Sequence, residues 1–86
     1  MQYFLSKQFE KSFSKLPKKV KSKAIEQLTI FAVDHMDARL NNHSLTGKWS
    51  DHRSINITGN VRAIYTEANE NIVRFVDIGS HPKLYG

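Results

Sequence analysis

Cysteine is absent from this chain of 86 residues, which excludes disulfides and thiolate metal sites as supports for the fold. A chain of this length forms one domain and buries only about 60–65% of the surface that its unfolded state exposes. We therefore expect a single domain over residues 1–86, whose stability depends on apolar packing and hydrogen bonds alone.

Long apolar runs are also missing. The apolar stretch at the start of the chain covers residues 1–5 and gives way to Ser6, Lys7 and Gln8. It is too short for the core of a signal peptide or for a membrane span. We expect the protein to remain in the cytoplasm and to have no membrane partner.

Acidic residues are few. Eight Asp and Glu stand against thirteen Lys and Arg, which gives a formal net charge of +5. This excess favours a polyanionic or acidic partner through long-range attraction and counterion release. A basic surface that only keeps the protein soluble explains the same charge equally well. The charge therefore allows nucleic-acid binding without establishing it.

The first half of the chain is predicted to form a short strand followed by two helices. Gln2–Leu5 is apolar and contains aromatic residues, which favours a strand, and Ser6 can cap the helix that follows. Pro17 separates that helix from the next. The apolar positions of the first helix are Phe9, Phe13 and Leu16. Those of the second are Val20, Ala24, Leu28, Phe31 and His35, with Ile25 and Ala32 widening the stripe.

The second half is predicted to contain three strands. Residues 41–44 are polar and indicate a loop, and residues 54–58 alternate strictly, with Ile55 and Ile57 pointing inward. A turn at residues 59–60 leads to a strand over 61–66, and a turn at 68–71 leads to an apolar strand over 72–78. Gly79 and Ser80 should end this last strand, and Pro82 should prevent further pairing.

This order of elements predicts an α+β fold. Two N-terminal helices should pack on one face of a twisted, mainly antiparallel sheet, in the order strand, helix, helix, strand, strand, strand. The opposite face of the sheet should then be open to a substrate.

Short motifs in the second half resemble those of one group of toxins. His43-Ser44-Leu45-Thr46-Gly47-Lys48-Trp49 resembles the His-x-Leu-x-Gly-x-Trp signature of YafQ-like toxins in the RelE/ParE superfamily. Arg53 stands where that branch has an arginine opening the next strand. Val61-Arg62-Ala63-Ile64-Tyr65 is similar to the hydrophobic-Arg-x-hydrophobic-Tyr strand of RelE-type toxins. Asp77-Ile78-Gly79-Ser80-His81, followed by Pro82-Lys83-Leu84-Tyr85-Gly86, resembles the Gly-Ser/Thr-His ending of the same superfamily.

The resemblance implies a RelE-like fold and the toxin of a type II toxin-antitoxin system. It also implies a metal-independent endoribonuclease with no cofactor, an mRNA substrate that is often cleaved on the ribosome, and a neutralising antitoxin as partner. None of these properties follows from composition or periodicity.

Cleavage of RNA without a metal needs a base, an acid and a cation. Histidine suits both proton roles, because its unperturbed pKa of about 6.5 leaves both forms accessible near neutral pH. His81 matches the C-terminal catalytic histidine of YafQ-like members and is the candidate general acid. His43, which opens the first signature, is the candidate base. An exposed turn residue for His81, and a loop or helix-capping residue for His43, are the simpler interpretations.

The candidate cation is Arg62, because a planar guanidinium can hold a phosphate with two parallel hydrogen bonds. An ion pair with Asp51 or Asp77 is the alternative. Arg53 is a weaker phosphate candidate. It is two residues from Ile55, so in a strand both side chains would point toward the core, unless the strand begins after Arg53.

Further candidates come from the same alignment of motifs. Tyr85 could stack on a base, contact the reacting hydroxyl, or anchor the chain end. Asn56 and Asn60 stand where YafQ-like enzymes carry a histidine and an aspartate; asparagine can bind a phosphate or ribose but cannot carry a proton. His35 is better explained as a residue at the edge of the core, and the histidines show no metal-ligand spacing.

Two other functions remain open at this stage. One is a ParE-like toxin that binds DNA gyrase and cleaves nothing; the two histidines argue against it, because a pure binder needs no proton carriers. The other is a degenerate module that binds RNA or antitoxin without catalysis, and Asn56 and Asn60 keep that interpretation open.

Overall fold

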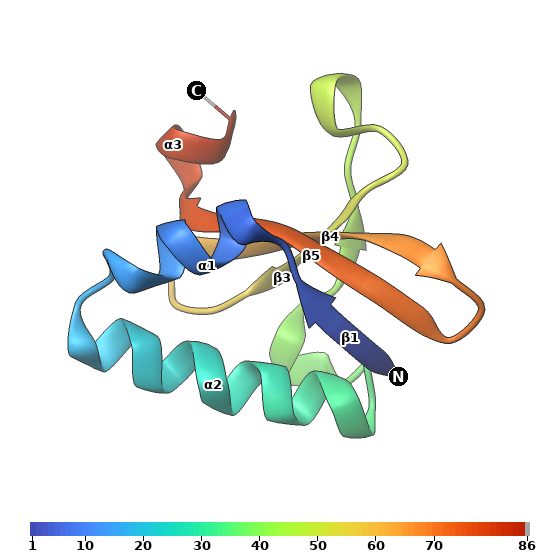
Figure 1. Ribbon diagram of the computed structural model, residues 1–86, viewed down its shortest axis with the longest axis horizontal. Coiled ribbons are helices and arrows are strands. Elements are labelled where there is room, and N and C mark those ends of the chain that lie inside the picture. The colour runs from blue at the N-terminus through green and yellow to red at the C-terminus, as the bar shows by residue number, and fades with distance from the viewer. Residues whose placement is uncertain (86) are drawn as a thin grey trace.

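The computed structural model describes residues 1–85, so Gly86, the last residue of the C-terminal motif, lies outside the described residues. Figure 1 shows the elements in chain order: β1 (Gln2–Leu5), α1 (Lys7–Ser14), α2 (Lys18–Val33), the 3₁₀ turn η1 (Ala38–Leu40), β2 (His43–Ser44), the 3₁₀ turn η2 (Gly47–Trp49), β3 (Arg53–Asn56), β4 (Val61–Asn69), β5 (Ile72–Ser80) and α3 (His81–Tyr85).

The strands form one five-stranded sheet in the order β1-β5-β4-β3-β2. β1 runs parallel to β5, and all other neighbouring strands are antiparallel. β1 can pair in parallel with β5 because the intervening chain, which contains α1 and α2, crosses over one face of the sheet. The predicted α+β class, with two N-terminal helices on a mainly antiparallel sheet, is confirmed.

Local sequence signals set the limits of α1 and α2. The Ser6 hydroxyl accepts a hydrogen bond from the Phe9 N–H at 3.0 Å and caps α1, as predicted. Pro17 lies immediately before α2, where a residue without a backbone N–H costs no helical hydrogen bond. The helix continues to Val33 and ends at Asp34, whose backbone is extended.

The buried stripe of α2 is narrower than the sequence suggests. Ala24, Leu28 and Phe31 are buried as predicted, but the neighbour Ile25 is 58% exposed. Ala32 is also exposed, and His35 lies beyond the end of the helix, half-buried. The prediction that Ile25, Ala32 and His35 belong to the apolar stripe was wrong. A polar residue beside Leu28 is buried on this side of α2 instead.

That polar residue is Gln27, which is only 3% exposed. Its side-chain amide donates to the carbonyl of Arg39 at 3.0 Å and to the carbonyl of Asn56 at 2.9 Å. A buried amide is stable when its hydrogen bonds are made, and here it connects α2 with η1 and β3. Gln27 therefore takes a core position that the predicted apolar stripe did not include.

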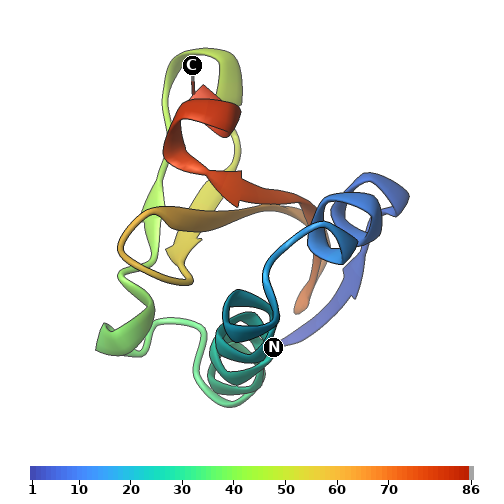
Figure 2. The same cartoon turned by 90° about the vertical axis from the view of Figure 1, so that its left-hand side faces the viewer.

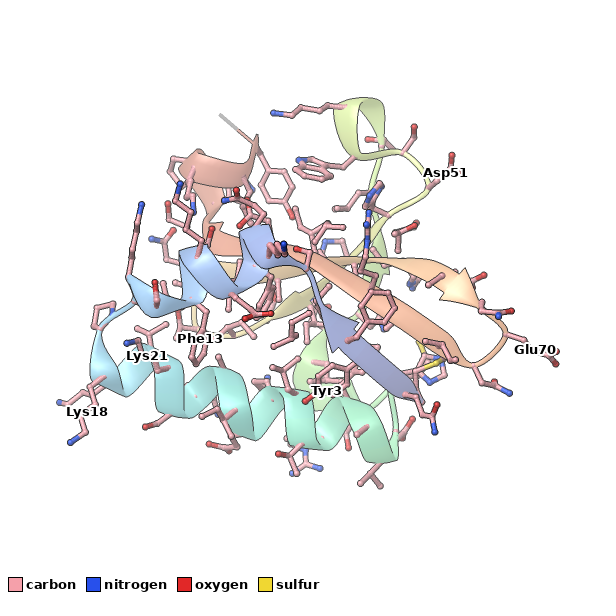
Figure 3. The ribbon with its side chains drawn as sticks, viewed as in Figure 1. Tyr3, Phe13, Lys18, Lys21, Asp51 and Glu70 are labelled. Atoms are coloured by element: carbon pink, nitrogen blue, oxygen red, sulfur yellow. The ribbon has the colours of Figure 1, made fainter. Side chains whose placement is uncertain are left out.

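Aromatic rings fill the space between the sheet and the helices. The ring of Phe31 lies 5.0 Å from that of Tyr65, 5.1 Å from that of Phe75 and 6.3 Å from that of Tyr3. Tyr3 and Phe13 point from β1 and α1 toward α2 (Figure 3). Both helices and the sheet therefore share one apolar core.

The second half differs from the prediction at several boundaries. Residues 43–44, expected in a loop, form the short strand β2, which pairs with β3. β4 extends to Asn69, so the turn is shorter than expected. β5 continues through Gly79 and Ser80, because Gly79 pairs with Arg62 and Ser80 pairs with Val61 across the sheet.

The C-terminal helix α3 was not predicted. It begins at His81, so Pro82 falls in its first turn, where a missing N–H is tolerated. α3 and the segment around η2 stand side by side on the face of the sheet opposite α2 (Figure 2). The Trp49 indole N–H donates to the Leu84 carbonyl at 3.0 Å, and Leu84 and Ile64 are buried. The sequence analysis predicted that this face would be open, but α3 and the segment around η2 cover part of it.

Candidate active site

Strand alternation divides the side chains of β3 and β4 between the two faces of the sheet. Ser54 and Asn56 lie on one face of β3, whereas Ile55 lies on the face that α1 and α2 cover. Direct cross-strand partners share a face, and Arg62 on β4 is the partner of Asn56. His43 on β2 is likewise the partner of Ser54. We call the face that carries His43, Asn56 and Arg62 the α3 face.

Helix α3 brings two more of the predicted residues to the α3 face. His81 and Tyr85 are four residues apart, and their ring centroids lie 4.5 Å from each other. The Tyr85 hydroxyl donates to Ser54 Oγ at 3.3 Å. The backbone N–H of His81 donates to the carbonyl of Asn60 at 2.9 Å. These contacts attach both ends of the helix to the sheet and its β3–β4 turn.

The two histidines lie at the ends of one strip of residues. Tyr85 contacts His81 through its ring and Ser54 through its hydroxyl, and Ser54 is the cross-strand partner of His43. Both imidazoles are on exposed residues. The structure thus brings His43 and His81 to the same face. We call these four residues, His43, Ser54, Tyr85 and His81, the histidine strip.

A hydrogen bond determines the tautomer of His43. Its Nδ1 lies 2.8 Å from the carbonyl oxygen of Asn41. Because a carbonyl can only accept, Nδ1 carries the proton, and in the neutral ring Nε2 keeps its lone pair. The ring is therefore oriented so that Nε2 can accept a proton from a bound molecule.

Among the described residues, no carboxylate forms an ion pair with Arg62. Its Nη1 donates to the carbonyl of Thr58 at 2.8 Å and to that of Val61 at 3.3 Å. Within residues 1–85 the salt bridges are Lys23–Glu26, Arg39–Asp37 and Lys83–Asp77, so the ion pairs considered for Arg62 are not formed. The guanidinium can therefore interact with an external anion.

Asn56 and Asn60 have different surroundings. Asn56 is half-buried, and its Oδ1 is buried without a hydrogen-bond donor in the described part of the chain. A buried acceptor without a partner is unfavourable, so this atom can gain from a ligand that donates. Asn60 is exposed, and its backbone carbonyl, rather than its side chain, receives the N–H of His81.

Arg53 lies apart from the histidine strip. It alternates with Ser54, and its Nε donates to Asn42 Oδ1 at 2.8 Å. The amide of Asn42 in turn donates to the Tyr65 hydroxyl at 2.7 Å. Arg53 and His52 line a separate hollow of about 520 Å³. The structure therefore does not bring Arg53 together with Arg62 and His81 around one group.

Sequence reasoning missed Ser54, which joins the two halves of the histidine strip. Its alternation with Ile55 places it on the α3 face, but nothing in the sequence indicates that Tyr85 returns to bind it. Trp49, the last residue of the first motif, lies against α3 and supplies a hydrogen bond to it.

Within residues 1–85, no three side chains of His, Cys, Asp or Glu are grouped so that they could hold a metal ion. The described helices include none that is both long enough and apolar enough to cross a lipid bilayer.

The fold, with two helices on one face of a mainly antiparallel sheet, is that of small toxins of the RelE type. The model of the family described as "Bacterial toxin of type II toxin-antitoxin system, YafQ" matches residues 1–86. The chain belongs to this family, and the resemblance seen in its motifs is confirmed.

Solved structures show the same fold. YafQ from E. coli strain BL21(DE3) has a TM-score of 0.82 at 22% identity, over 99% of this chain and 98% of that chain. The E. coli DinJ-YafQ toxin-antitoxin complex gives 0.79 at 24%, over 99% and 97%. A YoeB/ParE toxin from Agrobacterium tumefaciens gives 0.77 at 12%, over 94% and 99%. Among curated proteins, no sequence matches this chain.

Proposed function

We propose that this toxin is a metal-independent endoribonuclease that cleaves mRNA during translation in the cytoplasm and thereby stops protein synthesis. The observation that supports the proposal most directly is the histidine strip, in which His43 and His81 are connected through Ser54 and Tyr85. A surface that only binds a partner has no need of two imidazoles at the ends of one strip.

In the proposed reaction, His43 removes the proton of a ribose 2′-hydroxyl at Nε2, and the 2′-oxygen attacks the adjacent phosphorus. The bond from phosphorus to the 5′-oxygen breaks, and His81 donates a proton to that oxygen. The products are a 2′,3′-cyclic phosphate and a 5′-hydroxyl. In-line displacement requires the base and the acid on opposite sides of the phosphate, and the proposal assigns these places to His43 and His81.

Arg62 would stabilise the additional negative charge on the phosphate. Charge-assisted hydrogen bonds are roughly twice as strong as neutral ones, so a phosphate can compete with the Thr58 carbonyl for the guanidinium. The half-buried Asn56, the cross-strand partner of Arg62, would bind a phosphate or ribose through its side-chain amide. Tyr85 would orient His81 and contact the reacting group, and Asn60 would border the substrate.

A cognate antitoxin is the second proposed partner. The E. coli relative was solved as a toxin-antitoxin complex, and the formal charge of +5 favours an acidic or amphipathic segment. Co-purification of the toxin with the product of a neighbouring gene would test this partner.

The decisive experiment combines His81→Ala with a map of cellular mRNA. His81→Ala should abolish growth inhibition while antitoxin binding persists, whereas His35→Ala, at the end of α2 and away from the α3 face, should leave growth inhibition in place. Primer extension after induction should find cuts within translated codons for the wild type and none for His81→Ala.

The other outcomes are equally informative. Full toxicity of His81→Ala would refute the general-acid role. Intact mRNA together with stalled replication would refute the nuclease and indicate a ParE-like toxin that binds DNA gyrase. A wild-type protein that binds antitoxin but neither cleaves RNA nor inhibits growth would indicate a degenerate module.

A further inference from the structure

We propose that Lys83 is a positioning residue, which fixes the orientation of α3 and through it the places of His81 and Tyr85. This inference rests on the proposed nuclease function, because it concerns the residues assigned to catalysis. It is carried by contacts that neither the family motifs nor the strand pattern includes.

Helix α3 cannot hold its own orientation. It contains five residues, and an isolated helix of that length is far too short to be stable in water. Its position therefore depends on contacts with the rest of the protein. Three of them have been described: the His81 N–H binds the Asn60 carbonyl, Trp49 binds the Leu84 carbonyl, and Tyr85 binds Ser54. The last two attach the helix near its C-terminal end.

The Lys83 side chain supplies a fourth attachment, in a different direction. Its Nζ donates to Ser12 Oγ at 2.9 Å and lies 3.9 Å from Asp77 Oδ1. Ser12 is 3% exposed, and its hydroxyl donates to the same carboxylate oxygen of Asp77 at 2.6 Å. One side chain thus connects α3 with both α1 and β5.

The atoms that receive Lys83 are themselves held in place. The backbone N–H of Ile78 donates to Asp77 Oδ1 at 2.8 Å, and the side-chain amide of Gln8 donates to Ser12 Oγ at 3.0 Å. Lys83 therefore binds to a preformed polar group rather than to mobile surface side chains. We call Lys83, Ser12 and Asp77 the α3 clamp.

Gly79 shows the path that the Lys83 side chain takes to this contact. A Cβ added to Gly79 would lie 2.8 Å from Cδ of Lys83 and 3.4 Å from its Nζ. The aliphatic stem of the lysine therefore passes directly over Gly79 on its way to Ser12. The glycine that was expected to break β5 instead leaves room for this crossing.

The clamp holds the side of the helix opposite to the catalytic candidates. At 100° per residue, Lys83 projects about 200° away from His81, whereas Tyr85 projects close to the direction of His81. A bond on the opposite side resists rotation of α3 about its axis. Rotation is the motion that would move the His81 ring away from a bound phosphate.

The clamp should affect position more than stability. The Lys83 side chain is 47% exposed, and ion pairs of exposed groups contribute little to folding. A catalytic group that is misplaced by about 1 Å can lose on the order of 100-fold in rate. Lys83→Met, which keeps most of the length of the side chain but removes the ammonium group, should therefore lower kcat by about tenfold or more with little change in KM.

The test uses the full-length toxin with two readouts. The first is the rate of RNA cleavage. The second is the ring-current shift that Tyr85 imposes on the ring protons of His81, measured by NMR on free protein. Lys83→Met should reduce both, and Lys83→Arg should restore part of each. Lys15→Met loses the same charge from an exposed position on the surface and serves as the control.

A double-mutant cycle tests the route of the effect. Ser12→Ala should reproduce the loss seen in Lys83→Met, and combining the two should add little, because both remove the same clamp. Thermal denaturation of each variant distinguishes displacement of α3 from global unfolding.

The proposal is overturned if Lys83→Met shows the same ring-current shift and the same cleavage rate as the control Lys15→Met. Additive losses in the double-mutant cycle would overturn it as well. A wild-type protein that cleaves no RNA would refute the nuclease function. The ring-current measurement would still decide whether Lys83 positions His81.

Discussion

The Tyr85 hydroxyl donates a hydrogen bond to Ser54 Oγ over 3.3 Å, and Ser54 is fully buried. The bond joins the C-terminal helix to a central strand 31 positions earlier in the chain. Because Ser54 is also the cross-strand partner of His43 in the β2–β3 pair, a single buried residue lies beside both Tyr85 and His43.

Tyr85→Phe should therefore destabilise the protein by about 0.5–1.5 kcal/mol, since it removes one hydrogen bond and keeps the ring. Urea denaturation measures the change as a lower midpoint with an unchanged slope. Ser54→Ala in the Tyr85→Phe background should add less than it does alone. Strict additivity of the two changes would show that the bond is not formed in solution.

Much of the fold follows from local sequence. Ser6 caps α1 as its position before an apolar repeat predicts, and the alternation of Ile55 and Ile57 gives the buried face of β3. The pairing order of the strands is consistent with short antiparallel connections and one parallel crossover. These features depend on neighbours in sequence or on simple topology, which is why they could be predicted.

Helix α3 could not be predicted in the same way. Gly79, Ser80 and Pro82 are ordinary signals for the end of a strand, and five residues are too few for a helical repeat. The helix forms because Trp49, Ser54 and Ser12 bind it, and these residues lie far from it in sequence.

The candidate site was predicted in part. The motifs indicated His43, Arg62, His81 and Tyr85, and the structure gives them a common face; their chemical roles stay predictions. The parity argument that Arg53 points away from this face agrees with its contact to Asn42. No sequence pattern indicated a role for Lys83, whose contacts are with α1 and β5.

Gln27→Met should destabilise the protein by about 2–4 kcal/mol, although the two side chains are similar in size. The change leaves the carbonyls of Arg39 and Asn56 without the donors that now reach them at 3.0 and 2.9 Å. Chemical denaturation with Gln2→Met as an exposed control measures the difference. Equal stabilities for the two variants would mean that water replaces the amide at no cost.

Phe31→Ala should destabilise the protein by about 3–5 kcal/mol, a large part of the stability of so small a domain. Phe31 is fully buried and contacts the rings of Tyr65 and Phe75. Phe4→Ala removes the same group from a residue that is 47% exposed and should cost much less. Thermal denaturation of both variants tests whether the described core is the one that holds the fold. Similar melting temperatures for the two would contradict it.

Arg62→Lys should reduce RNA cleavage by about tenfold or more while the melting temperature changes little. A lysine keeps the positive charge and can still bind the Thr58 carbonyl, which Arg62 Nη1 now contacts at 2.8 Å. It cannot form two parallel hydrogen bonds to a phosphate, so the loss should appear in kcat rather than in stability. Arg74→Lys, at an exposed position on β5, makes the same chemical change away from the proposed phosphate and should leave the rate unchanged. Equal rates for the two variants would remove Arg62 from the proposed reaction, and the acid–base pair would then need another source of charge stabilisation.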